Sequence, residues 1–149
     1  MIRICFHGAE STGKSVLAER LSAELRLPWV PEYGRTYAEQ HGTQFSIADL
    51  LAIAAGHEAQ VQVLADSGAA LALLDTDPLM TAVWAQMLFD PDVPWIKDGT
   101  RLFGSTAERA RFAGLAEAVL EQTGVPFERI SGSWAEREAR ARKIIAGLT

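Results

Sequence analysis

The stretch that decides the fold is Gly8-Ala9-Glu10-Ser11-Thr12-Gly13-Lys14-Ser15. It fits the pattern G-x-x-x-x-G-K-[ST], the glycine-rich loop that cradles nucleotide phosphates in P-loop proteins. Backbone N–H groups of such a loop wrap a β-phosphate, and the positive end of the helix that follows adds to the attraction. We therefore predict that residues 8–16, the loop with Val16, bind nucleotide phosphates. Lys14 would reach the β/γ-phosphates, and the Ser15 hydroxyl would hold Mg²⁺.

The residues on either side of the loop are typical of a strand and a helix. Residues 2–6 are short and apolar with β-branched side chains, and Leu17, Leu21 and Leu25 lie four apart on one helical face. This order of strand, loop and helix favours an α/β fold in which helices cover both faces of a central parallel sheet.

Length and composition narrow the class further. The chain has 149 residues, enough for a single α/β domain over 1–149, and a formal net charge of −5, which argues against a non-specific nucleic-acid binder. No apolar run reaches the ~18 residues of a membrane span, and the first residues lead directly into a strand rather than a signal peptide. We expect a cytoplasmic protein with no membrane or nucleic-acid partner. Its one cysteine, Cys5, is expected to be a small buried residue of the first strand.

A second strand is predicted at residues 27–30, with prolines near both ends that suit a sheet edge. Glu32-Tyr33-Gly34-Arg35 follows at its carboxyl end, the edge at which open α/β sheets bind ligands. A carboxylate there can accept a proton from a substrate hydroxyl or bind a sugar diol. The alternative is a solvated acid paired with Arg35, and position alone does not decide between the two.

Residues 46–66 read as a long helix that begins with the capping box Ser46-x-x-Asp49. Its predicted apolar stripe consists of Ile47, Leu50, Leu51, Ala54, Val61 and Leu64. His57 falls on this stripe. It is either a core histidine or, with Gly56 beside it giving room, a ligand contact.

The apolar run 69–74 ends in Asp75-Thr76-Asp77. A buried parallel strand that ends in an acid is what a P-loop protein needs as its second Mg²⁺ support, so Asp75 is predicted to be a metal ligand. The alternative is that both acids cap the next helix, which suits Asp77 better than Asp75.

A loop rich in Pro, Gly and Asp, residues 90–101, leads into a helix predicted near 106–122. The arginines that cluster here are Arg101, Arg109 and Arg111. Mobile arginines that close over transferring phosphates are a lid device of small-molecule kinases, so we expect a lid around 97–111. A solvated helix face is the alternative. A short strand at 127–130 and a last helix, capped by Ser133 and Glu136, complete the chain.

Several stretches together resemble one family. They are the phosphate loop, Pro31-Glu32-Tyr33-Gly34-Arg35-Thr36-Tyr37-Ala38, Gly56-His57, Asp75-Thr76-Asp77 with Thr81 and Trp84, and Asp98-Gly99-Thr100-Arg101. The set resembles the ribosylnicotinamide kinase domain of bacterial NadR-type proteins, which are P-loop small-molecule kinases with an AAA-like ATPase domain. Such kinases transfer the γ-phosphoryl of ATP to the ribose 5′-hydroxyl of nicotinamide riboside, in NAD biosynthesis.

The resemblance implies ATP and Mg²⁺ as cofactors, a sheet order of 2-3-1-4-5, and roles for particular residues. Catalytic residues would be Lys14, Glu32, Asp75, Asp77, Arg101 and Arg109, with Glu32, Asp75 or Asp77 taking the acceptor's proton. Acceptor contacts would be Glu32, Tyr33, Arg35, His57, Asp77 and Trp84. Loop residues Ser131 to Trp134 would lie near adenine. Two other functions stay open: a nucleotide-binding regulatory ATPase or switch with no small-molecule acceptor, and a kinase for another small alcohol or nucleoside.

The sequence departs from the family in three places. It starts at the kinase strand, whereas NadR-type proteins often carry an adenylyltransferase domain first. Lys97 stands where the family often has a second acid. The stretch from Asp77 to Asp90 is too short for a helix and the parallel strand after it, and family members have about twenty more residues there. We therefore predict a break in the chain within 85–90, where a mobile segment is missing.

Overall fold

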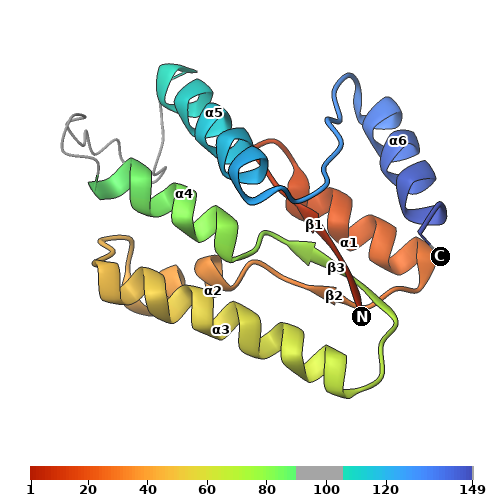
Figure 1. Ribbon diagram of the computed structural model, residues 1–149, viewed down its shortest axis with the longest axis horizontal. Coiled ribbons are helices and arrows are strands. Elements are labelled where there is room, and N and C mark those ends of the chain that lie inside the picture. The colour runs from red at the N-terminus through yellow and green to blue at the C-terminus, as the bar shows by residue number, and fades with distance from the viewer. Residues whose placement is uncertain (90–105, 149) are drawn as a thin grey trace.

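The structure, a computed structural model, describes residues 1–89 and 106–148. Within these ranges the elements are β1 (Ile2–Phe6), α1 (Lys14–Leu25), β2 (Trp29–Val30), α2 (Tyr33–His41), α3 (Ile47–Asp66), β3 (Leu71–Asp75), α4 (Pro78–Phe89), α5 (Thr106–Thr123) and α6 (Trp134–Ala146). Figure 1 shows helices on both sides of a small central sheet. The fold is therefore α/β, as the sequence predicts.

The sheet of the described residues has three parallel strands in the order β1-β3-β2. Ile2 of β1 lies opposite Leu71 of β3, and Phe6 lies opposite Asp75. All five residues of β3 are buried, because neighbouring strands pair with both of its edges and helices cover both of its faces. The carboxyl ends of β1 and β3 therefore meet at one edge of the sheet, where the phosphate loop begins.

Two apolar clusters cover the two faces of the sheet. On one face Leu71 and Leu73 pack against α1 and α6, whose buried residues there include Leu21 and Ile145. On the other face Ala72 and Leu74 pack with Val30 and with Val61 of α3. This alternation along β3 is the period of two that a strand buried on both faces requires.

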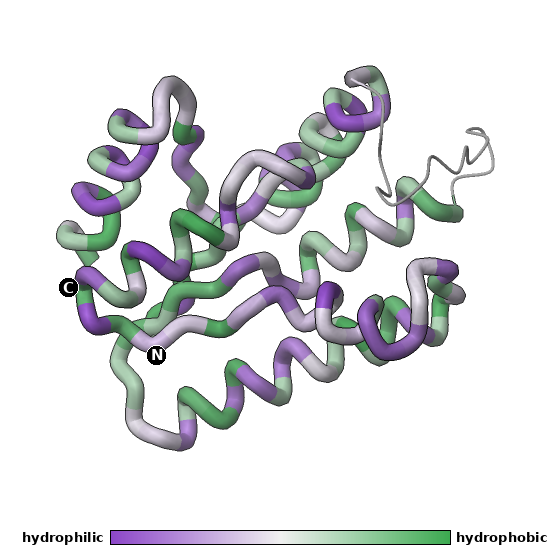
Figure 2. Tube along the Cα trace, turned by 180° about the vertical axis from the view of Figure 1, so that it is seen from behind, coloured by the Kyte–Doolittle hydropathy of each residue, from purple (hydrophilic) through white to green (hydrophobic). Residues whose placement is uncertain are grey.

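A third apolar cluster joins α4 to α5. Helix α4 packs against both α3 and α5, and none of its twelve residues is charged. In Figure 2 the tube along α4 is accordingly mostly green and white, whereas the other helices carry more purple. Among the described residues, no helix combines the length and the apolar character that crossing a membrane would require.

Most elements of the first half lie where the sequence predicts them. The order of the three strands matches the first three places of the predicted order 2-3-1-4-5, while its fourth and fifth places are not confirmed. The predicted strand at 127–130 is wrong, since these residues are described and form no strand. A strand needs the backbone of a neighbour. Within the described residues only β3 pairs with β1, and residues 127–130 pair with no strand of the sheet.

The predicted apolar stripe of α3 is partly wrong. The helix buries Leu50, Ile53, His57 and Val61, whereas the side chains of Ile47 and Leu51 are exposed. The capping box at its start is confirmed: Ser46 and Asp49 exchange side-chain and backbone hydrogen bonds. The second capping box, Ser133 with Glu136, is also confirmed at the start of α6.

Two further predictions fall wholly or partly outside the described residues. Helix α4 is continuous from Pro78 to Phe89, and Asp90 lies outside the described ranges, so the break expected within 85–90 stays a prediction. Most of the lid predicted around 97–111, including Lys97 and Arg101, also lies outside them.

Candidate functional site

The phosphate loop connects β1 to α1 through backbone conformations that residues other than glycine rarely adopt. Gly8 and Gly13 have φ angles of 134° and 84°, and Ser11 has a φ of 57°. The two glycines have no Cβ to clash in this region, which is the physical reason that the motif fixes glycine at its ends. Gly13 then precedes the first residue of α1. The loop thus ends at a helix N-terminus, which favours bound anions.

Lys14 lies at the centre of the charged groups of the site. Its Nζ atom donates a hydrogen bond of 2.8 Å to the carbonyl oxygen of Ala9, within the loop. Burial lowers the pKa of Lys14, while the nearby carboxylates of Glu32, Asp75 and Glu10 act in the opposite direction. The Ala9 carbonyl therefore holds the ammonium group at the loop, within electrostatic reach of acids on two other segments.

Asp75 has the features of a metal ligand. It ends β3 and is 2% exposed, and its Oδ1 atom is buried without a hydrogen-bond partner in the described part of the chain. A buried carboxylate oxygen without a partner is costly unless another group binds it. By the alternation of β3, Asp75 continues the row of Leu71 and Leu73 that faces α1, the helix that carries Ser15.

Ser15 and Asp75 together fit Mg²⁺, which binds oxygen ligands and usually keeps several waters. Within the described residues the Ser15 hydroxyl accepts a long hydrogen bond, 3.4 Å, from Nη2 of Arg35. A hydroxyl and a carboxylate beside a phosphate loop are the donor set that P-loop proteins offer this ion.

Glu32 immediately precedes α2, at the end of β2. One of its oxygens pairs with Nη2 of Arg35 at 3.2 Å, so the ion pair that the sequence left open is present. Burial raises the pKa of Glu32, and the charge of Asp75 raises it further, against the opposing effects of Arg35 and Lys14. A carboxylate with a raised pKa close to a phosphate site is better suited to accept a proton than an ordinary surface acid.

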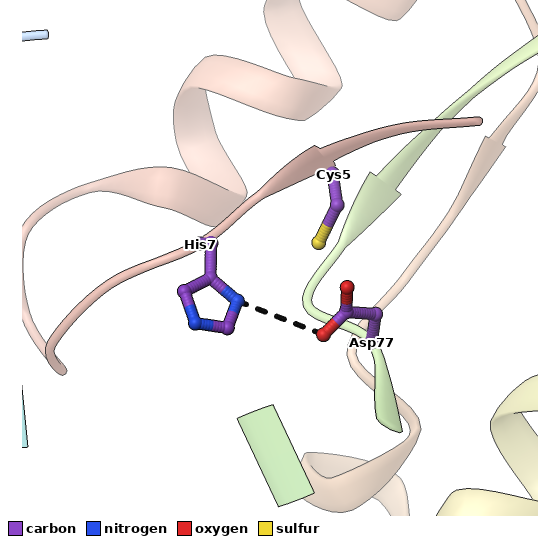
Figure 3. Close-up of side chains that lie close together, drawn as sticks. All are labelled: Cys5, His7 and Asp77. Carbon is purple, nitrogen blue, oxygen red and sulfur yellow. Dashed lines mark ion pairs between the residues drawn. The ribbon is translucent and has the colours of Figure 1, made fainter. Parts of the chain in front are cut away.

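Asp77 has a different environment. Its Oδ1 atom accepts a hydrogen bond of 3.0 Å from the Met80 amide. Asp77 therefore caps α4, which is the second of the two roles that the sequence allowed for it. Burial by itself raises the pKa of Asp77, but the His7 ring, the Met80 amide and the Cys5 thiol lower it below its usual value. Figure 3 shows the Cys5, His7 and Asp77 side chains pointing toward one another. No motif in the sequence singles out His7 or links it to Cys5.

His57 lies on the buried stripe of α3 and is 3% exposed. Burial lowers its pKa, and the charge of Asp77 is the strongest of the effects that oppose this. The Nε2 atom has no hydrogen-bond partner among the described residues. His57 is therefore buried but close to the acids of the site, and its contact with an acceptor stays a prediction.

Two aromatic residues of the predicted acceptor site have packing partners. The ring of Tyr33 lies directly against Gly56, where any side chain would overlap it. Tyr33 therefore fills the space that the missing side chain of Gly56 leaves. Trp84 packs edge-on against Phe112 of α5, with ring centroids 5.5 Å apart.

Helix α6 brings two residues to the phosphate loop. The ring of Trp134 lies against Gly13, and the Arg137 guanidinium lies 4.6 Å from the centre of that ring. Nη1 of Arg137 also donates a hydrogen bond of 2.8 Å to the carbonyl oxygen of Thr12. Trp134 is among the site residues predicted from the sequence, whereas Arg137 is not. Ser131 is exposed before α6, and Arg109 is exposed on α5.

Fold and site together define a P-loop domain of the α/β class. A family model described as an AAA domain matches residues 3–93, more than half of the chain. The chain therefore belongs to this AAA-domain family.

The comparisons also confirm the predicted resemblance to NadR. The chain is 27% identical to the trifunctional NAD biosynthesis/regulator protein NadR of Escherichia coli and 26% identical to that of Salmonella typhimurium. Each match covers 83% of this chain and 36% of the relative, so the chain spans about a third of their length.

Two solved structures share the fold. One is NadR in complex with NAD and AMP-PNP, and the other is NadR in complex with NR. Both align with a TM-score of 0.75 at 18% identity. The alignments cover 98% and 99% of this chain, and about half of each solved chain.

Proposed function

We propose that this chain transfers the γ-phosphoryl group of ATP to a hydroxyl of a nucleoside-like acceptor, with nicotinamide riboside as the first candidate. The observation that carries the proposal is the meeting of Lys14, Asp75 and Glu32 at one edge of the sheet. Each of these side chains affects the charge state of at least one other, so they lie within electrostatic reach. The likeness to NadR, with solved complexes of AMP-PNP and NR, supports this choice of donor and acceptor.

The three acids divide into different roles. Asp75 would hold Mg²⁺ with Ser15, because its buried Oδ1 atom has no partner in the described residues. When bound, the ion would neutralise charge on the phosphates. Asp77 caps α4, and its lowered pKa makes it a weak base. Glu32, with its raised pKa, is therefore the acid that we propose to accept the proton of the acceptor hydroxyl.

The remaining predicted residues complete the proposed site. Lys14 would stabilise charge that develops on the transferring group, and Arg101 and Arg109 would close over it as a lid. Trp134 and Ser131 would lie near adenine. Tyr33, Arg35, His57 and Trp84 would contact the acceptor. Most of the rate enhancement would come from positioning and charge neutralisation, as in other phosphoryl transfers.

A coupled assay of ADP release over a panel of nucleosides and small alcohols tests the proposal. We expect ADP release that needs both Mg²⁺ and an acceptor, with nicotinamide riboside giving the highest kcat/KM. Acceptor-dependent release with another compound as the best substrate would keep the kinase and change the acceptor. ADP release that no acceptor stimulates would overturn the proposal in favour of a regulatory ATPase.

A further inference from the structure

A cluster of three potential metal ligands lies beside the proposed phosphoryl-transfer site. Cys5 and His7 come from the end of β1 and the residue after it, and Asp77 comes from the turn between β3 and α4. One ligand atom from each, the Cys5 Sγ, a His7 ring nitrogen and an Asp77 carboxylate oxygen, lies within 4.8 Å of the other two. The cluster is not sealed from solvent, since the Asp77 side chain is 19% exposed.

The hydrogen bonding of His7 leaves one ring nitrogen available. Its Nε2 atom lies 3.0 Å from the carbonyl oxygen of Ala116, which can only accept, so Nε2 carries a proton. In the neutral ring Nδ1 then has the free lone pair. Nδ1 is buried without a hydrogen-bond partner within the described residues, and the His7 side chain is only 8% exposed. A histidine that donates one N–H to a backbone carbonyl is oriented as metal-bound histidines usually are.

The spacing of the cluster also suits a metal better than a direct hydrogen bond. His7 Nδ1 and Asp77 Oδ1 are 3.6 Å apart, as the dashed line in Figure 3 marks. This is long for a hydrogen bond. Two ligands at about 2.0–2.1 Å from a tetrahedral zinc ion lie roughly 3.4 Å from each other.

We propose that Cys5, His7 and Asp77 form a binding site for a thiophilic divalent cation such as Zn²⁺, with a fourth position open to water. Thiolate and imidazole ligands select zinc-like ions, whereas Mg²⁺ binds oxygen ligands such as those of Ser15 and Asp75. When the ion binds, the Cys5 thiol releases its proton to solvent, and the resulting thiolate is the ligand. The site does not depend on the proposed kinase activity, because the proposed phosphoryl transfer assigns no step to these three residues.

Titration of the reduced full chain with Co²⁺ alone, in excess Mg²⁺, tests the site. Because Cys5 is the chain's only cysteine, a thiolate-to-cobalt charge-transfer band reports on this residue alone. The band is expected to saturate at one Co²⁺ per chain, to be displaced by Zn²⁺ and to disappear in Cys5→Ser. His7→Gln keeps a donor for Ala116 and should weaken binding by roughly tenfold or more. The same change at the exposed His41 should not.

Two outcomes would overturn the site. One is the absence of a charge-transfer band. The other is equal cobalt affinity in His7→Gln and His41→Gln, which would show an ordinary thiol beside a His–Asp pair. If His7→Gln fails to fold, ¹⁵N spectra of the wild-type imidazoles decide instead. Zn²⁺ should then shift the Nδ1 resonance of His7, and an unchanged resonance would equally overturn the site.

Discussion

The indole ring of Trp134 lies against Gly13 so closely that a Cβ at position 13 would come within 2.5 Å of its Cη2 atom. Gly13 therefore lacks a side chain for two independent reasons, its φ of 84° and this contact. The contact joins the first turn of α6 to the phosphate loop, although the two are far apart in the sequence. We infer that α6 supports the loop in its nucleotide-binding conformation.

Arg137→Ala tests this support. The substitution removes the hydrogen bond to the Thr12 carbonyl and the contact with the Trp134 ring. We expect the KM for ATP to rise by about 5- to 30-fold, because a charged hydrogen bond contributes about 1–2 kcal/mol in such a place. The matched control is Arg140→Ala on the same helix, where the arginine forms an exposed ion pair with Glu128. Equal KM values in both variants would contradict a role for α6 in nucleotide binding.

Glu32→Gln tests the proposed base. The amide cannot accept the acceptor's proton, so kcat should fall by about 10²–10⁴-fold while the affinity for ATP changes little. The control is Glu128→Gln, which removes an exposed acid of the pair with Arg140. If Glu32→Gln keeps its full kcat, then Asp75 or Asp77 is the base and Glu32 is not.

Glu32→Gln should also change the stability of the folded chain, which can be measured independently of activity. The pKa of Glu32 is raised in the folded chain, so the folded state binds more protons than the unfolded state between the ordinary and the raised pKa. Glu32 therefore stabilises the folded state at a pH below both pKa values, and this stabilisation is lost as the pH rises from the ordinary to the raised pKa. At neutral pH, Glu32→Gln should therefore raise the Tm of the ligand-free chain by about 1–4 °C, and a lower Tm would contradict the raised pKa.

The burial of His57 predicts that stability depends on pH with a sign opposite to that expected for Glu32. Burial lowers its pKa in the folded chain, so unfolding takes up a proton below the ordinary value of about 6.5. Stability should fall as the pH drops below that value. His57→Gln should flatten this part of the curve of Tm against pH, whereas His41→Gln, at an exposed site, should leave it unchanged. Equal slopes in both variants would show that His57 is not held neutral by burial.

The expected gap within 85–90 has a direct test in the natural protein. The chain of 149 residues has a mass of 16.2 kDa. A missing segment of about twenty residues, enough for a strand and its connection, would add roughly 2 kDa. The intact mass of the protein purified from its own source, with peptide mapping across this region, decides the matter. Peptides that run without interruption from Ala85 to Asp90 would refute the gap.

Much of the site could be predicted because its chemistry fixes local sequence. The phosphate loop needs glycine at positions 8 and 13 and a lysine at 14, so its pattern is visible without a structure. The capping boxes at Ser46 and Ser133 are equally local. Asp75 followed from a buried strand that ends in an acid, which is again a property of adjacent residues.

The parts that could not be predicted depend on distant segments. Ile47 and Leu51 have the spacing of a buried stripe, but periodicity does not show which turns of α3 find a packing partner. Residues 127–130 have the composition of a strand, but a strand forms only beside another. His7 gave no signal because its partners, Asp77 and Ala116, are brought to it by the fold.

The central claim is tested most directly by following the γ-phosphoryl group itself. The purified chain would be incubated with Mg²⁺, nicotinamide riboside and ATP labelled at the γ-phosphate, beside Lys14→Ala as the inactive control. We expect label in nicotinamide mononucleotide, one equivalent for each ADP formed, and none with Lys14→Ala. Label released only as inorganic phosphate, or equal transfer by Lys14→Ala, would contradict it.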